Sequence, residues 1–271
     1  MNFKKLNQNY LENGAVLVKN FVTGKNLEFV KLAIEFAKNN PSPFSSKLKN
    51  SNEIKNDKET SFFHDYWTYK RNDYIKKLLS DKEITKKIQT ISGNKNVRFF
   101  HDHILIKNPS SIHTPWHHDR PYYFIDGPNN FSIWISVDAV GEENSLAFCS
   151  GSHKSKNIYV PVHFDNTSLL SDDPNLKVLD EKALEKESSN GILIFKMSPG
   201  DAIFFHNRTL HKSMPSSDKK VRSALSLRML GDNACLTNIC CKNPQPPFDK
   251  FGMDLIEGGE PSKEWFPELP F

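Results

Sequence analysis

The distribution of hydrophobic positions along the chain changes near residue 96. From about 96 to 232 the chain contains short runs rich in β-branched and aromatic residues, separated by proline, glycine, asparagine and serine. These runs are VRFFHDHILI, FSIWISVDAV, SLAFCSGSH, GILIFKM, DAIFFH and VRSALSLRML. Residues of the first kind favour strands, and the separators favour turns. The number and spacing of the runs predict a mainly β fold of the jelly-roll type, with its core at about 96–232.

The N-terminal part, about 1–93, has a different pattern. Within residues 25–39 the apolar positions recur at helical spacing, which predicts an amphipathic helix lying on a core. These positions are Leu27, Val30, Ile34 and Ala37. A second helical region is expected over residues 62–93, and the polar stretch 42–60 is expected to be a loop. We therefore expect N-terminal helices packed outside the jelly roll.

The last part of the chain, residues 233–271, is rich in proline and glycine, which predicts an irregular tail. The sequence has no visible internal repeat. A length of 271 residues fits one domain with helical additions, so the three parts are expected to form a single domain, 1–271.

The charge distribution argues against a nucleic-acid-binding surface. The net charge is only +4, from 36 basic against 32 acidic residues. The lysines are scattered among asparagine, aspartate and glutamate, as on a solvated surface. Only six of the basic residues are arginine. Each arginine is therefore a candidate for a specific role, because lysine does not reproduce the planar guanidinium group.

The sequence gives no indication of a membrane or extracellular location. The N-terminus has no apolar signal-peptide region, and no stretch approaches the roughly 18 apolar residues that a membrane span requires. The four cysteines lack paired C-x-x-C spacing, so neither a zinc site nor a disulfide framework is expected. We expect a cytoplasmic protein with reduced thiols that binds neither nucleic acid nor a membrane.

The segment Trp116-His117-His118-Asp119 is the strongest candidate for chemistry. On an extended strand, residues two apart point the same way, so His117 and Asp119 converge while His118 faces the opposite side. His211, at the end of a later strand, is the candidate for a third ligand. Two histidines and one carboxylate leave three positions of an octahedral ion open, which indicates non-haem Fe(II), whereas zinc prefers four-coordinate sites.

Arg222 follows His211 after a polar, turn-forming stretch, residues 213–220. We expect Arg222 to lie on the neighbouring antiparallel strand and to point into the same cavity as His211. A guanidinium group buried there must meet an anion, since an unpaired buried charge is very unfavourable. The distal carboxylate of 2-oxoglutarate fits its two-pronged donor geometry.

These motifs and their order resemble the phytanoyl-CoA dioxygenase family of Fe(II)/2-oxoglutarate-dependent oxygenases. The resemblance covers roughly residues 96–232. It is carried by VRFFHDHILIKNPSSIHTPWHHDRPYY, FSIWISVDAV, GSHK, PGDAIFFHNRTLHKS and VRSALSLRMLGD. By this resemblance the jelly roll is a double-stranded β-helix. His117, Asp119 and His211 match the iron ligands of the family, and Arg222 matches its 2-oxoglutarate arginine.

The resemblance also implies residues of the co-substrate pocket. Ser213 resembles a hydroxyl that reaches the distal carboxylate of 2-oxoglutarate. Trp134 and His103 lie where the family lines this pocket, and Thr114 is a further candidate for a polar contact. Lys107 matches a common lysine of the family, to which no role is assigned.

The activity implied is that of an Fe(II)- and 2-oxoglutarate-dependent dioxygenase, which uses O2 to hydroxylate a small organic substrate. A polar or anionic substrate is among the candidates, while the substrate's identity, the reaction outcome and the oligomeric state do not follow from the sequence. The alternative is a non-catalytic metal-binding jelly roll that acts as a sensor or binding module, which would need the triad but not Arg222 or Ser213. A metal-dependent hydrolase with the same ligands is a third hypothesis.

Some positions depart from the pattern of the family. His103 stands where relatives often carry an amide or thioether side chain, and His118 replaces a usual glutamine. Asp119 disfavours the halogenating branch, in which a small residue replaces the carboxylate. The roles of His118 and of three neighbours stay open: Arg120, Tyr122 and Tyr123.

Overall fold

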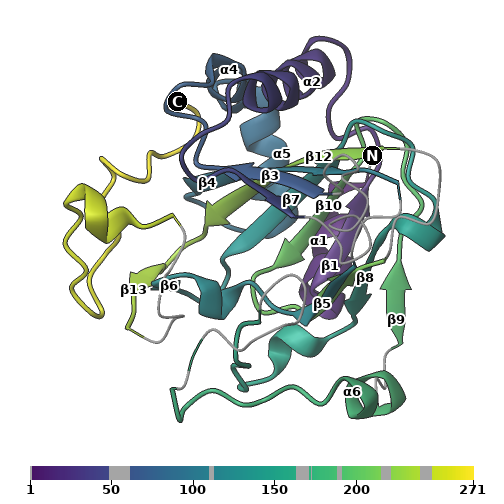
Figure 1. Ribbon diagram of the computed structural model, residues 1–271, viewed down its shortest axis with the longest axis vertical. Helices are drawn as coiled ribbons and strands as arrows, with labels where there is room; N and C mark the ends of the chain where they lie inside the picture. The colour runs from purple at the N-terminus through teal and green to yellow at the C-terminus, as the bar shows by residue number, and fades with distance from the viewer. Residues whose placement is uncertain are drawn as a thin grey trace.

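The protein is built on two antiparallel sheets that pack face to face (Figure 1). The structure, a computed structural model, describes residues 2–48, 62–109, 113–162, 171, 173–187, 191–214, 221–238 and 246–271. The larger sheet has the strand order β1-β10-β7-β12-β4-β3-β2, and the smaller one has the order β5-β11-β8-β9. This architecture is the predicted jelly roll.

The larger sheet consists of β1 (Ala15–Val18), β2 (Ser46–Leu48), β3 (Phe62–Tyr66), β4 (Arg98–Lys107), β7 (Phe131–Ser136), β10 (Ala202–His206) and β12 (Arg222–Leu230). The smaller sheet consists of β5 (Thr114–His117), β8 (Leu146–Cys149), β9 (Ile192–Ile194) and β11 (His211–Ser213). A separate pair joins β6 (Ile125–Asp126) to β13 (Cys235–Leu236). The α-helices are α1 (Phe3–Asn13), α2 (Gly24–Asn39), α4 (Asp73–Leu79), α5 (Lys82–Ser92) and α6 (Glu181–Glu187). Short 3-10 turns cover Arg120–Tyr122, Glu142–Asn144, Ser152–Lys154 and Phe248–Phe251.

Side chains of the larger sheet alternate between two hydrophobic cores. On β7, Ile133 and Ile135 pack with the helices, whereas Trp134 lies in the core between the sheets. On β12, Leu225 belongs to the helical side and Ala224 to the inter-sheet side. This two-residue period is the one expected of a strand buried on both faces. Every second side chain of β4, β7 and β12 therefore points into the space between the sheets.

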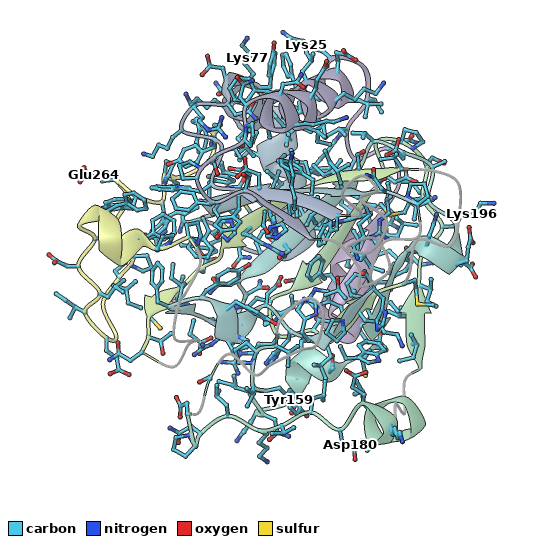
Figure 2. The ribbon with its side chains drawn as sticks, viewed as in Figure 1. Lys25, Lys77, Tyr159, Asp180, Lys196 and Glu264 are labelled. Carbon is cyan, nitrogen blue, oxygen red and sulfur yellow. The ribbon has the colours of Figure 1, made fainter. Side chains whose placement is uncertain are left out.

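Four helices cover the outer face of the larger sheet, as predicted (Figure 1). Helix α2 begins one residue before the predicted range and buries the apolar stripe Val30, Ala33, Ile34 and Ala37. Asp81 caps the N-terminus of helix α5, where its side chain accepts from the backbone N–H groups of Glu83 and Ile84. Charged side chains such as Lys25 and Lys77 project outward from this layer (Figure 2). The helices close one side of the scaffold and leave the inter-sheet space for the site.

The N-terminal part also contributes strands that the sequence pattern did not reveal. Strand β1 pairs with β10, and β3 pairs with β4, so both extend the larger sheet. The prediction of a helical region beginning at residue 62 is therefore wrong for β3. Strand β3 pairs with β4 in regular register: Phe63 lies opposite Ile106, and His64 lies opposite Leu105. The expected loop at 42–60 contains β2 at its start, and its residues 49–60 lie outside the described residues.

The C-terminal tail packs as irregular chain against one end of the sandwich. Its Phe248 and Phe266 are completely buried and contact Phe100 and Phe124. These rings form a third core, which holds the tail in place although its described residues have little regular secondary structure. Among the described residues, each helix is too short or too polar to cross a lipid bilayer.

Candidate metal centre

His117 and His211 lie opposite each other on adjacent strands of the smaller sheet. His117 ends β5, and His211 begins β11, where the register pairs the two residues directly. Their ring centroids are 4.3 Å apart, and His211 is buried. Cross-strand pairing therefore brings together two imidazoles that are far apart in sequence.

Asp119 completes the cluster, but not by the strand parity expected from the sequence. Strand β5 ends at His117, and Asp119 has helical backbone angles at the start of the turn Arg120–Tyr122. The expected extended conformation is therefore wrong, yet the turn brings the carboxylate to the same place. One potential ligand atom from each of His117, Asp119 and His211 lies within 4.8 Å of the others. This spacing and donor set suit one metal ion.

Hydrogen bonds select the imidazole nitrogen that is left to bind a metal. The Nδ1 atom of His117 lies 2.9 Å from the carbonyl oxygen of Pro115, and Nδ1 of His211 lies 2.9 Å from that of Thr209. Since a carbonyl only accepts, each Nδ1 carries the proton and each Nε2 presents its lone pair. The Nε2 atom of His211 is 4.0 Å from Oδ1 of Asp119. Burial lowers the pKa of His211 to about 3, so its imidazole is neutral, as a ligand must be.

Arg228 and Ser132 orient the carboxylate of Asp119. Both Arg228 and the Ser132 hydroxyl donate to Oδ2, the latter over 3.0 Å, which leaves Oδ1 facing His211. Burial acts to raise the pKa of Asp119, but the charge of Arg228, the two histidines of the triad and the Ser132 hydrogen bond together outweigh it and hold this pKa below its usual value. The carboxylate is therefore ionised and fixed in one orientation before any metal arrives.

A second polar group lies between the sheets, at the other end of β12. The Lys107 ammonium donates to Ser213 Oγ over 2.6 Å and to Thr114 Oγ1 over 3.3 Å. Arg222 is buried and donates to the carbonyl of Asn144. Burial lowers the pKa of Lys107 well below its ordinary value, and the charge of Arg222 lowers it further. Two buried groups of like charge repel each other, and an anion bound between them would relieve this repulsion. Lys107 and Arg222 therefore form a candidate anion site.

Arg222 reaches this place from a different strand than the sequence suggested. Its strand, β12, pairs with β4 and β7 in the larger sheet, whereas His211 lies on β11 in the smaller one. The prediction of a neighbouring strand is therefore wrong, and Arg222 faces the site from the opposite sheet. Its guanidinium lies 5.6 Å from the ring centroid of Trp134, which walls the same interior space. Among the described residues it forms no ion pair with a carboxylate.

His103 lies on β4 between the two polar groups. Its Nε2 atom is 3.4 Å from Nδ1 of His64, a residue of β3 that the sequence did not single out. Two residues along the same face, His101 is also buried, and the charges of Arg228 and Asp119 act on it. His103 is therefore buried, and its part in a co-substrate pocket stays a prediction. His64 lies beside it only because β3 joined the sheet.

The structure shows what the residues beside the triad contact. His118 points away from the triad, and its Nε2 accepts the backbone N–H of Tyr159 over 3.0 Å. Arg120 is buried and pairs with Asp126 at 3.0 Å. The Tyr122 hydroxyl donates to the carbonyl of Val162 over 2.7 Å. These residues hold the surrounding chain in place.

Arg228 is the most important residue that the sequence reasoning missed. A usable signal existed, because Arg228 and Arg222 are six positions apart on one strand, and an even spacing puts both on the same face. Ser132 carried no such signal. Only the pairing of β12 with β7, which sets Arg228 opposite Ser132, reveals its contact with Asp119.

Buried neutral histidines predict a marked dependence of stability on pH. Burial lowers the pKa of His64 and His206 to about 4 and that of His101 and His118 to about 3. Between about pH 4 and 6.5 the unfolded chain therefore binds protons that the folded chain excludes. We expect the free energy of unfolding to fall below pH 6.5, by up to about 1.4 kcal/mol per pH unit for each such histidine. Urea denaturation of the metal-free protein from pH 7.5 to 5 measures this, and a flat profile would contradict it.

The family model for phytanoyl-CoA dioxygenase (PhyH) matches residues 10–224, most of the chain. The protein belongs to the phytanoyl-CoA dioxygenase family. The matched residues include the triad and Arg222 and end before Arg228. No curated protein sequence matches the chain significantly.

Solved structures share the fold of this family member at low sequence identity. The non-haem α-ketoglutarate-dependent epimerase SnoN from nogalamycin biosynthesis is 16% identical, with 98% of this chain and 95% of that chain covered and a TM-score of 0.73. The carbocyclase SnoK from the same biosynthesis is 17% identical, with 98% and 96% covered and a TM-score of 0.73. EctD from S. alaskensis, solved with 2-oxoglutarate and 5-hydroxyectoine, is 17% identical, with 95% and 84% covered and a TM-score of 0.67. These likenesses show the jelly-roll fold.

Proposed function

We propose that the protein is an Fe(II)- and 2-oxoglutarate-dependent dioxygenase that hydroxylates a small organic substrate. The observation that carries this proposal is the pairing of two preorganised groups in one interior space. One group is the His117, Asp119 and His211 triad, and the other is the anion site formed by Lys107 and Arg222. A protein that bound only a metal would need the triad but not the anion site.

The triad fits a ferrous ion by its donors and by its surroundings. The Nε2 atoms of both histidines and Oδ1 of Asp119 would hold the metal and leave three positions open. Of the buried polar atoms that have no hydrogen-bond partner within the described residues, three belong to β4 and β12, the strands that carry His103, Arg222 and Arg228: His101 Nε2, Ser226 Oγ and Arg228 Nε. Buried polar atoms are normally satisfied, so their presence beside the triad supports the binding of further polar groups there.

The anion site fits the distal carboxylate of 2-oxoglutarate. Arg222 and Lys107 would neutralise its charge, and the hydroxyls of Ser213 and Thr114 would complete its hydrogen bonds. Trp134 would wall the carbon chain between this carboxylate and the metal. His103, on the same face of β4, would lie beside the bound co-substrate.

When bound, the ferrous ion and 2-oxoglutarate supply an O2-derived oxidant strong enough to attack an unreactive C–H bond, with release of succinate and CO2. The protein residues bind the co-substrate, orient it against the metal and exclude water. Arg228 and Ser132 hold Oδ2 of Asp119 and would leave Oδ1 free to hold the metal. Arg222 and Lys107 fix the far end of the co-substrate, so that its reacting end reaches the triad in one orientation.

A non-catalytic metal-binding module remains the second candidate, because it shares the fold and the triad. A buried arginine that has no carboxylate partner among the described residues disfavours it, since a module that binds only a metal gains nothing from such a charge at Arg222. Among the proteins with this fold, SnoN is an epimerase, SnoK is a carbocyclase, and EctD was solved with 5-hydroxyectoine. Hydroxylation is accordingly one outcome among several that this scaffold supports.

The test is the binding of 2-oxoglutarate to the anaerobic Fe(II) protein, followed by turnover. We expect a visible absorption band from the Fe(II)–2-oxoglutarate complex and, in air, slow release of succinate that requires both components. Zinc in place of iron serves as the control and gives neither signal. A protein that binds Fe(II) but shows no effect of 2-oxoglutarate would favour the non-catalytic module.

A further inference from the structure

The inner face of the larger sheet continues beyond the metal centre. The smaller sheet covers this face on the side away from the helical layer (Figure 1). Its strand β11 lies over β10, where the ring centroids of His211 and Phe205 are 4.7 Å apart, and its strand β5 lies over β4, where Lys107 donates to Thr114. Within the described part of the chain β5 is the edge strand of the smaller sheet, so β3, the next strand after β4, extends past it. Strands β4 and β3 therefore form the wall on this side of the metal centre, while hydrophobic core fills the other side.

This wall carries aromatic and imidazole side chains. Lys107 marks the inward face of β4, and residues an even number of positions from it share that face, as do their direct partners on β3. We call five of these residues the imidazole wall: Phe62, His64, Tyr66, His101 and His103. The ring of Tyr66 lies 5.7 Å from that of His103 and 6.4 Å from that of His101. Burial lowers the pKa of His64 to about 4, that of His101 to about 3 and that of His103 well below its ordinary value, so the imidazole wall is uncharged at pH 7.

His101 is the member of the imidazole wall that adjoins the metal centre. It pairs across the sheet with Arg228, which donates to the carboxylate of Asp119. The Nδ1 atom of His101 lies 3.1 Å from the carbonyl oxygen of Asp102, so Nδ1 carries the proton and Nε2 presents a lone pair. This Nε2 is buried and has no hydrogen-bond partner within the described residues. Because buried acceptors are normally paired, the donor for Nε2 is expected to come from a bound molecule.

The charges near His101 disfavour an ionic group at Nε2. Arg228 and Asp119 form an ion pair with each other, and the imidazole wall adds no charge. Besides burial, the charge of Arg228 lowers the pKa of His101 by more than Asp119 raises it, so an ammonium group placed there would be repelled. A carboxylate would bring only acceptors to an acceptor. A hydroxyl group, in contrast, donates one hydrogen bond and needs no counter-ion.

We propose that the imidazole wall binds the substrate, and that this substrate is an uncharged ring compound whose hydroxyl group donates to Nε2 of His101. This inference rests on the proposed function, which places the reaction at the triad. The ring packs against Tyr66, and the hydroxyl holds the molecule beside Arg228 and the carboxylate ligand Asp119. His101 thereby determines specificity. Of the candidates that the sequence left open, a polar substrate is favoured and an anionic one is disfavoured.

The test uses four probes of one skeleton: benzyl alcohol, toluene, benzylamine and benzoate. Their dissociation constants are measured by calorimetry with the anaerobic Fe(II) protein, with and without 2-oxoglutarate. We expect benzyl alcohol to bind about tenfold more tightly than toluene, which corresponds to one hydrogen bond to a buried acceptor, and at least as far ahead of the two ionic probes. Equal binding of benzyl alcohol and toluene, tighter binding of either ionic probe, or no binding of any probe would overturn the proposal.

Variants link the preference to Nε2 of His101. His101→Phe keeps a ring but removes the acceptor, so benzyl alcohol should bind no better than toluene, whose affinity should stay within about twofold. His101→Gln, whose amide oxygen accepts, should recover part of the preference. His153→Phe is the matched control: the Nδ1 atom of His153 also lacks a partner, but its Nε2 lies 3.2 Å from the carbonyl oxygen of Leu11, so the preference should stay unchanged.

Fe(II) titration of the same variants separates substrate recognition from support of the metal. An unchanged preference in His101→Phe would refute the role of Nε2. Equal weakening of benzyl alcohol and toluene together with a loss of Fe(II) would show that His101 serves the metal centre, and would overturn the proposal as well. The preference of the parent protein among the four probes tests the substrate class even where a variant fails to fold.

The 2-oxoglutarate absorption band separates this inference from the proposed function. A band without a preference for benzyl alcohol would refute the assignment of the imidazole wall and leave the oxygenase in place. A preference without a band would refute the oxygenase and with it the assignment of the wall as a substrate site.

Discussion

Replacing His117, Asp119 or His211 by alanine should abolish Fe(II) binding at micromolar metal and, with it, all turnover. Each substitution removes one of three ligand atoms that lie within 4.8 Å of one another. Loss of a partner that merely orients a ligand already weakens metal binding about 10- to 100-fold, so loss of a ligand itself should exceed that. Binding is measured by anaerobic titration with Fe(II), and the circular dichroism of each variant checks the fold. Full iron binding in any variant would remove that residue from the site.

His118→Ala is the matched control for these substitutions, because it changes the histidine next to His117. His118 points away from the triad and accepts the Tyr159 N–H, so iron affinity should stay within about threefold of the parent value. The variant would lose only the hydrogen bond that His118 accepts from the Tyr159 backbone. A loss of iron as severe as in His117→Ala would show that the two histidines had been assigned the wrong way round.

Arg222→Ala should raise the apparent KM for 2-oxoglutarate strongly while leaving iron affinity nearly intact. The expected loss is about 2–4 kcal/mol, or roughly 30- to 1000-fold, for a charge-assisted contact in a confined site. Lys107 remains in the variant and still attracts the carboxylate, so binding should be weakened and not abolished. Arg222→Lys should recover only part of the loss, since an ammonium does not reproduce the guanidinium fork. Succinate release against 2-oxoglutarate concentration gives the KM values.

Two comparisons make the Arg222 result specific. A 2-oxo acid without the second carboxylate should lose much less activity in Arg222→Ala than 2-oxoglutarate does. Arg71→Ala, at an arginine on the outer surface that pairs with Asp65, should leave KM unchanged. An unchanged KM in Arg222→Ala would refute the anion site and shift support to the non-catalytic module.

The sequence by itself determined the scaffold and the donor set of the metal site. Strands in the core were visible because alternation and turn residues are local properties, which the chain displays without any tertiary contact. Helix α2 was visible for the same reason, through the spacing of Val30, Ile34 and Ala37. The triad was identifiable because a carboxylate and an imidazole two residues apart stay close in almost any local conformation. Asp119 shows this, since it reaches the triad from a turn although a strand was expected.

Only the tertiary structure decided which distant strands meet. The short segments β1 and β3 have no clear signal alone and became strands because β10 and β4 offered unpaired edges. Arg222 reaches the site from the sheet opposite His211, because β12 pairs with β4 and β7 and not with β11. The contact of Arg228 with Asp119 depends on the same pairing of β12 with β7. Side-chain periodicity tells which face a residue occupies, whereas the register between strands, set by the packing of the whole core, tells what that face meets.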